Sequence, residues 1–271
     1  MPDVAVSARR GRELTWPWFL VVVVAYLAVL KGTGAAIGID TSGSESQFPT
    51  TESVIRNGLV PIAVSVLFGA AVVTWLGWWR EVLHYRAPAR TWVWFVPLSM
   101  LAAALLGMNY PNLTAQKASL VLSLLAMTAC VGIAEELMFR GIGVQVFKRA
   151  GLTEGKVALY SSLVFGLVHL SNAFGDGSRV VLQAVVVSTS GYFFYLCLRV
   201  GGSLLLPMAV HGLWDFGLLS NSVGTDPRTS AGMVLPIVLQ VVLIVLLIIK
   251  RRSVDPAPAV PTAALPDARP S

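Results

Sequence analysis

Long apolar stretches, separated by short polar ones, dominate the chain. A helix that crosses a bilayer needs ~20 predominantly apolar residues, and eight stretches are close to or above that length. The pattern predicts spans at residues 16–38, 58–79, 91–108, 117–147, 157–173, 179–199, 203–220 and 232–249. Short segments of alternating apolar and polar residues, which are typical of transmembrane β-strands, do not occur. We therefore predict an all-α fold, a polytopic transmembrane helical bundle of about eight spans.

The connections between these stretches divide the chain into five segments. Residues 1–15 precede the first span, and residues 16–116 hold three spans. Residues 117–220 hold spans four to seven. Short connections that contain glycine separate the last five spans, so that part of the chain should form one compact bundle. Residues 221–252 hold the last span. Residues 253–271 are rich in proline and alanine, lack apolar periodicity and are predicted to be a disordered tail.

The fourth stretch is longer than one straight crossing requires. We expect it to tilt or to project from the membrane at one end. Three glycines, Gly132, Gly141 and Gly143, lie near the two glutamates at positions 135 and 136 of this stretch, where they should loosen the helix.

Composition and charge agree with a membrane protein. The chain is 55% hydrophobic and 13% charged, about half the charged share of a soluble domain. Lysine and arginine gather in alternate connections, which predicts an integral protein of the plasma membrane with both termini cytoplasmic. No basic face with interleaved aromatic residues occurs, so we expect the lipid bilayer, and no nucleic acid, as a partner. Cys130 and Cys197 lie in apolar stretches and are predicted to be buried thiols.

Two adjacent glutamates, Glu135 and Glu136, interrupt the fourth apolar stretch. A carboxylate in hydrocarbon costs at least a few kcal/mol, and two neighbours also repel each other. Arg140 is four residues after Glu136 and shares its helix face, whereas Glu135 points about 100° away. We expect Arg140 to hold Glu136 ionised, which leaves Glu135 as the candidate general base, although either glutamate fits that role. The alternative is an ion pair that only fixes helix packing.

Two histidines lie in later spans. His169 follows Phe165 by one helical turn, and His211 precedes Asp215 by the same spacing. Taken singly, His169 can be a packing residue, and His211 with Asp215 can be a pair that stabilises its helix. At 1.5 Å per residue, however, His169, His211 and Glu136 all lie roughly 18–20 Å from the basic residues at one membrane boundary. This common depth predicts that the three groups meet near the middle of the membrane.

Such a cluster supports two kinds of chemistry. Glu135 or Glu136, with His169, can activate water against a carbonyl, while His211 and Asp215 contact the developing oxyanion. Alternatively, Zn²⁺ can bind there, with Glu135, His169 and His211 as candidate ligands. The common zinc-protease helix motif His-Glu-x-x-His is absent, so a metal cofactor is left open.

The order and spacing of these residues resemble a known family. Glu135-Glu136-x-x-x-Arg140, Phe165-x-x-x-His169 and His211-x-x-x-Asp215 are similar to the three motifs of the CPBP family, a group of CAAX-prenyl-protease-2-like and bacteriocin-processing proteins. The resemblance covers residues 117–220. It implies an all-helical intramembrane endopeptidase, a hydrolase classed as a metalloprotease. In this family, the glutamate and the first histidine are assigned to the activation of water. The second histidine and the last residue of the third motif are assigned to the oxyanion site. Asp215 departs from the eukaryotic prenyl proteases, which typically have asparagine there.

Three hypotheses of function follow from the sequence. The first is an intramembrane endopeptidase whose substrate is a peptide or a membrane protein. The second is a non-catalytic membrane protein that binds a peptide or a bacteriocin and confers immunity. The third is a proton-coupled transporter, because intramembrane carboxylates and histidines also form proton relays. The lack of inverted halves or paired broken helices argues against the third hypothesis.

Overall fold

The protein is a helical bundle without β-strands over the residues that the computed structural model describes, which are 12–87, 89–172, 177–226 and 230–255. The helices of the N-terminal part are α1 (Trp16–Ile37), α2 (Thr51–Val54), η1 (Ile55–Leu59), α3 (Val60–Leu76), α4 (Trp79–Leu83), η2 (Thr91–Trp94), α5 (Phe95–Gly107) and α6 (Tyr110–Ala115). Those of the C-terminal part are α7 (Ala118–Glu136), η3 (Leu137–Gly143), α8 (Val144–Arg149), α9 (Glu154–Val168), η4 (His169–Asn172), α10 (Gly177–Gly201), α11 (Leu205–Leu219), η5 (Ala231–Met233), α12 (Val234–Lys250) and η6 (Arg251–Ser253).

Each of the eight predicted spans coincides with a helix. Among the described residues, five continuous helices are long and apolar enough to cross a membrane: Trp16–Ile37, Thr51–Leu76, Ala118–Arg149, Val181–Gly201 and Ala231–Ser253. Thr91–Gly107 and Leu205–Leu219 are shorter apolar helices. Helix α9, whose first turn carries Glu154 and Lys156, is in neither group. The all-α polytopic bundle is therefore confirmed, while a count of eight crossings stays a prediction.

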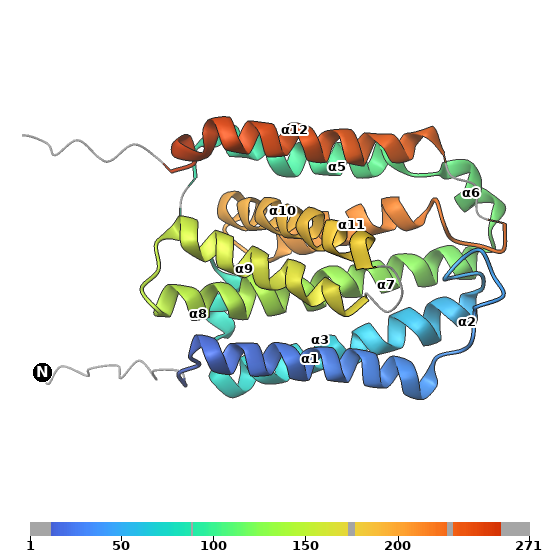
Figure 1. Ribbon diagram of the computed structural model, residues 1–271, viewed down its shortest axis with the longest axis horizontal. Coiled ribbons are helices and arrows are strands. Elements are labelled where there is room, and N and C mark those ends of the chain that lie inside the picture. The colour runs from blue at the N-terminus through green and yellow to red at the C-terminus, as the bar shows by residue number, and fades with distance from the viewer. Residues whose placement is uncertain (1–11, 88, 173–176, 227–229, 256–271) are drawn as a thin grey trace, which may run out of the picture.

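Helix α7 lies in the middle of the bundle. Helices α1 and α3 flank it on one side, α5 and α12 form the opposite edge, and α9, α10 and α11 lie between (Figure 1). Helix α7 packs against α3 and α11, α11 packs against α5, and α9 packs against α10. The start of α1 and the end of α12 lie at the same end of the bundle. The predicted core helices thus surround the segment that carries the two glutamates.

The long fourth span changes its helical form directly after the glutamates. Helix α7 ends at Glu136, and the backbone continues as a π-helical segment, Leu137–Gly143, before α8 begins. This segment includes Gly141 and Gly143, in agreement with the prediction that glycines loosen the helix near this point. Inserted π-turns are frequent at functional sites because they change the direction in which neighbouring side chains point.

Glycines bring α7 and α11 close together. A Cβ atom on Gly132 would lie 2.4 Å from the carbonyl oxygen of Met208 and 2.9 Å from the backbone nitrogen of Gly212. A Cβ atom on Gly212 would in turn lie 3.0 Å from the carbonyl oxygen of Thr128. Small residues permit this close backbone approach between helices in membranes. The contact places His211 beside the end of α7.

A polar cluster joins α8, α9 and α10 at one end of the bundle. Glu154 accepts hydrogen bonds from the hydroxyl groups of Tyr85, at 2.6 Å, and Tyr195, and it pairs with Lys148 at 3.6 Å. Burial acts to raise the pKa of Glu154, but the hydrogen bonds from Tyr195 and Tyr85, with the charges of Lys148 and Arg199, outweigh burial and lower that pKa below its usual range. Ionised Glu154 therefore stabilises this end of the bundle.

The chain after η6 is partly ordered. The carbonyl oxygen of Val254 accepts a hydrogen bond from the backbone nitrogen of Arg90, and Asp255 forms an ion pair of 2.9 Å with Arg199. Residues 254 and 255 thus contact Arg90, in the loop before η2, and Arg199, while the predicted disorder of the tail stays a prediction. Residues 256–271 of the predicted tail, and residues 1–11 of the N-terminal segment, lie outside the described residues.

Candidate active site

A buried ion pair forms the base of the site. Arg140 donates from Nη1 to Oε1 of Glu136 at 3.1 Å, and both side chains are inaccessible to solvent. The predicted pairing of these two residues across one helical turn is therefore present. Glu136 Oε2 and Arg140 Nε and Nη2 have no hydrogen-bond partner among the described residues. Removing either member would leave an uncompensated buried charge, which typically costs about 3–5 kcal/mol.

Aromatic rings complete the surroundings of Arg140. Its guanidinium lies 4.2 Å from the centre of the Phe165 ring and 5.5 Å from that of the Phe194 ring. A ring face attracts a cation, and the attraction grows when water is excluded. Gly191 makes room for the arrangement, because a Cβ atom there would lie 2.6 Å from Arg140 Nη2. Residues of α9 and α10 thus surround the guanidinium group that pairs with Glu136.

His211 from α11 is the second partner of Glu136. Its Nδ1 lies 2.8 Å from Glu136 Oε1 and donates to that carboxylate, while Phe194 stacks on the imidazole with 4.3 Å between ring centres. Both contacts fix the plane of the ring. The hydrogen bond of Nδ1 goes to Glu136 and not to Asp215, because the glycine contact between α7 and α11 brings His211 and Glu136 together.

Two further carboxylates face the other nitrogen of the same ring. His211 Nε2 lies 3.6 Å from Oε2 of Glu135 and 3.6 Å from Oδ2 of Asp215. These distances exceed a hydrogen bond, so Nε2 is available to another oxygen atom. The side chain of Glu135 is 14% exposed and that of Asp215 26% exposed, in contrast to Glu136. The accessible side of the cluster therefore consists of Glu135, Asp215 and His211 Nε2.

His169 lies at the edge of the cluster, at the end of α9. Its Nδ1 donates to the carbonyl oxygen of Phe165 at 2.9 Å, and the two rings meet edge-on with 5.0 Å between centres. A neutral imidazole that donates through Nδ1 carries its lone pair on Nε2, where it can accept a proton. The ring of Phe165 also meets that of His211, with 5.9 Å between centres. The structure thus brings all six predicted residues, Glu135, Glu136, Arg140, His169, His211 and Asp215, to one place.

Two aromatic residues at the site were not predicted from the sequence. Phe194 stacks on His211, and Tyr26 of α1 is buried with a hydroxyl group that has no hydrogen-bond partner among the described residues. The ring of Tyr26 meets that of Phe139 edge-on, and the charge of Glu135 acts on its hydroxyl group. Both residues lie in apolar stretches, where an aromatic residue looks like ordinary packing. A signal for Tyr26 was its hydroxyl group within an apolar run of the first span.

The side chains do not fit a metal centre as they are arranged. Within the described ranges, no group of three or more histidine, cysteine, aspartate or glutamate side chains is placed to hold a metal ion. The suggested ligand set of Glu135, His169 and His211 is thus not gathered around one point in this arrangement. Cys130 and Cys197 are free thiols; Cys197 is buried as predicted, whereas Cys130 is only partly buried.

Comparison with known proteins connects this cluster to one family. Residues 116–217, less than half of the chain, match the family model described as Rce1-like, type II CAAX prenyl endopeptidase Rce1-like. The comparisons with curated proteins and with solved structures gave no match. The matched region contains α7 to α11 with all six predicted site residues, while Tyr26 lies outside it. The region of residues 116–217 is thus Rce1-like, and the resemblance to the CPBP family is confirmed.

Proposed function

We propose that the protein is an intramembrane endopeptidase of the CAAX-prenyl-protease-2-like type, embedded in the plasma membrane with both termini cytoplasmic. The observation that carries the proposal is the convergence of three carboxylates on one histidine. Glu136 binds His211 Nδ1, while Glu135 and Asp215 face Nε2 from two helices. A helix-packing pair needs one carboxylate for Arg140, so the others call for a chemical explanation.

Glu135 is the proposed general base. Its carboxylate is at the accessible side of the cluster and makes no hydrogen bond with a described residue, so it can accept a proton from water. His169 presents Nε2 with its lone pair at the same edge and helps to orient that water. Glu136 instead acts as a positioning residue, because Arg140 and His211 both occupy its Oε1.

The proposed hydrolysis has two steps, attack of water on the carbonyl carbon and cleavage of the C–N bond. The water oxygen bonds to the carbonyl carbon of the substrate while its proton passes to Glu135. The carbonyl oxygen becomes an oxyanion, which accepts a hydrogen bond from protonated Nε2 of His211. When the C–N bond breaks, Glu135 returns the proton to the leaving amine, and the products are a carboxyl and an amino terminus. Asp215, 3.6 Å from Nε2, stabilises the imidazolium without donating to the oxyanion.

Purified protein in detergent tests the proposal with fluorogenic peptides that end in a CAAX sequence, each with and without a prenyl group on its cysteine. We expect cleavage by the wild type and a loss of about 10²–10⁴-fold in Glu135→Gln. His169→Ala should lower kcat as well. Equal cleavage by the wild type, Glu135→Gln, Glu136→Gln and His169→Ala would contradict the proposal. The prenylated and plain peptides separate the two substrate classes.

A further inference from the structure

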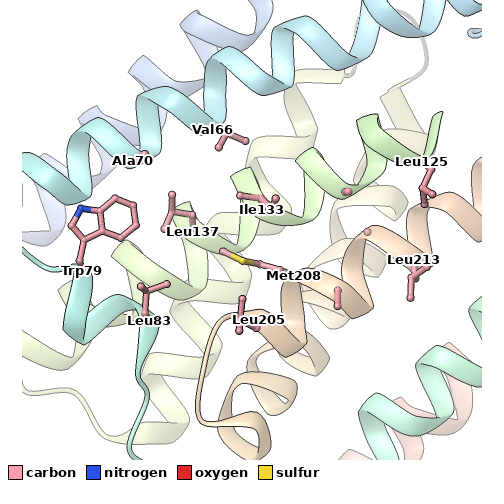
Figure 2. A pocket seen from close by; sticks show the side chains of 13 residues that line it. Val66, Ala70, Trp79, Leu83, Leu125, Ile133, Leu137, Leu205, Met208 and Leu213 are labelled. Carbon is pink, nitrogen blue, oxygen red and sulfur yellow. The ribbon is translucent and has the colours of Figure 1, made fainter. Parts of the chain in front are cut away.

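An apolar groove whose lining includes none of the site residues runs along α7 and α11. Helices α3, α7 and α11 form its walls, and α4 closes one end (Figure 2). It has a volume of about 520 Å³, and every side chain that lines it is apolar, among them Val66, Ala70, Ile133 and Met208. In a bilayer such a surface takes up hydrocarbon in preference to water.

The groove is separate from the cluster of carboxylates. Ile133 of α7 and Leu137 at the start of η3 line the groove, whereas Glu135 is about 200° around the helix from Ile133. Neither Glu135 nor His211 belongs to the lining. Any role of the groove therefore does not depend on the proposed function of the carboxylate cluster.

The closed end of the groove adjoins a basic hollow. Trp79 and Leu83 of α4 line the groove, while Arg80, Glu81, His84 and Arg86 line a neighbouring hollow of about 450 Å³. All four side chains of the hollow are exposed. Neither Arg80 nor Arg86 forms an ion pair within the described part of the chain. Two arginines against one glutamate leave an excess of positive charge next to the apolar groove.

The length of the groove matches one leaflet of a bilayer. It extends from Leu125 of α7 to Leu137 at the start of η3, which is about 18 Å at 1.5 Å per residue. Half of a ~30 Å hydrocarbon core is of similar depth. An indole ring such as that of Trp79 favours the boundary between the hydrocarbon and the polar headgroups. The apolar groove, the indole ring of Trp79 and the basic hollow thus lie in the same order as the acyl chain of a lipid, the membrane boundary and the lipid headgroup.

We propose that α3, α4, α7 and α11 bind one phospholipid with an anionic headgroup. An acyl chain occupies the apolar groove between α3 and α11, and the phosphate group lies in the hollow beside Arg80, His84 and Arg86. Basic pockets between membrane helices bind anionic headgroups in this way, because a phosphate group accepts hydrogen bonds and carries a negative charge.

Full-length protein, purified in detergent and stripped of lipid, tests this proposal. Phosphatidylglycerol and phosphatidylcholine with the same acyl chains are titrated separately, and bound lipid is counted by native mass spectrometry. We expect phosphatidylglycerol to bind about tenfold more tightly. Arg80→Gln with Arg86→Gln should remove that difference, whereas the matched control, Arg251→Gln with Arg252→Gln, should retain it. Ala209→Phe, which fills the groove, should weaken the binding of both lipids.

Three results would overturn the proposal. The first is equal affinity of the wild type for both lipids. The second is the same loss of selectivity in the control pair as in Arg80→Gln with Arg86→Gln. The third is unchanged lipid binding in Ala209→Phe together with weaker binding of an apolar peptide, since the groove would then serve a peptide segment. Unchanged thermal unfolding in all variants confirms that these exposed substitutions preserve the fold.

Discussion

The two faces of the α7–α11 pair differ in almost every physical property. One face carries Glu136 and His211, which are charged or polar, buried and joined by a hydrogen bond. The other face carries Ile133 and Met208, which are apolar and line an open groove. Glu136 follows Ile133 by three residues and His211 follows Met208 by three, so the members of each pair lie only about 60° apart around their helix. The comparison teaches that the polar groups of the candidate site are confined to one face, while the other face is apolar.

The largest expected effect comes from the buried face. Glu136→Gln leaves the charge of Arg140 uncompensated, so it should lower the free energy of unfolding by about 3–5 kcal/mol. Denaturant unfolding in detergent measures this change. The matched control is Glu52→Gln, since Glu52 and Arg56 form a pair with the same spacing but exposed side chains. It should cost less than about 1 kcal/mol, and equal losses in both variants would contradict the account.

The second expected effect separates activity from stability. Glu135→Gln should lower kcat by about 10²–10⁴-fold, because it removes the proposed base. The free energy of unfolding should change by less than about 1 kcal/mol, because Glu135 is partly exposed and makes no ion pair with Arg140. A peptide-cleavage assay and an unfolding curve on the same preparation measure the two quantities. If stability falls as much as in Glu136→Gln, the two glutamates do not have different roles.

The third expected effect concerns the contact that joins the two faces. Gly212→Ala would place Cβ 3.0 Å from the carbonyl oxygen of Thr128 and should separate α7 from α11. We expect a loss of about 1–3 kcal/mol in stability and a lower kcat, because His211 moves away from Glu136. In the control Gly32→Ala, the added atom meets nothing within 4 Å. A lower kcat in the control as well would show that the contact has no special role.

The groove face should tolerate change. Ala209→Leu adds apolar volume to the open groove, so we expect a change in the free energy of unfolding within about 0.5 kcal/mol and an unaltered kcat. Cleavage and unfolding assays on the purified variant measure both. A tenfold lower kcat would mean that the two faces are coupled.

The smallest effect is expected from a carboxylate outside both faces. The pKa of Glu154 lies below its usual value, so its ionised form stabilises the fold at neutral pH. That contribution begins to fade as the pH falls below about 4.3 and is lost as the pH passes through the lowered pKa. The apparent Tm of Glu154→Gln should therefore depend less on pH between about 6 and 3 than that of the wild type. If the Tm of the wild type and the Tm of Glu154→Gln changed equally with pH, the stabilising role of ionised Glu154 would be contradicted.

Local features of the site could be predicted from the sequence because they depend on helical spacing. Apolar stretches gave the positions of the helices, and the four-residue spacing of Glu136 and Arg140 predicted their ion pair, which the structure contains. The common depth of Glu136 and His211 predicted their meeting, and the two residues are hydrogen-bonded.

Features that depend on the packing of distant segments could not be predicted. The hydrogen bond of His211 goes to Glu136 on another helix and not to Asp215 one turn away, because backbone contact at Gly132 and Gly212 decides which carboxylate is within reach. Phe194 and Tyr26 were missed because an aromatic residue in an apolar stretch gives no sign of what it contacts. The groove was also not predicted, since it is formed by α3, α7, α11 and the short helix α4, which come together only in the folded chain.

The central claim is that Glu135, next to the buried Glu136 and His211, activates the water molecule that hydrolyses a peptide bond. The most direct test compares the membrane peptides of four strains: the wild type, a deletion, and deletions rescued with Glu135→Gln or with Ala209→Leu. We predict that the same peptides accumulate uncut in the deletion and in Glu135→Gln, and that they are cut in the wild type and in Ala209→Leu. Cleavage in Glu135→Gln equal to that in the wild type would contradict the account.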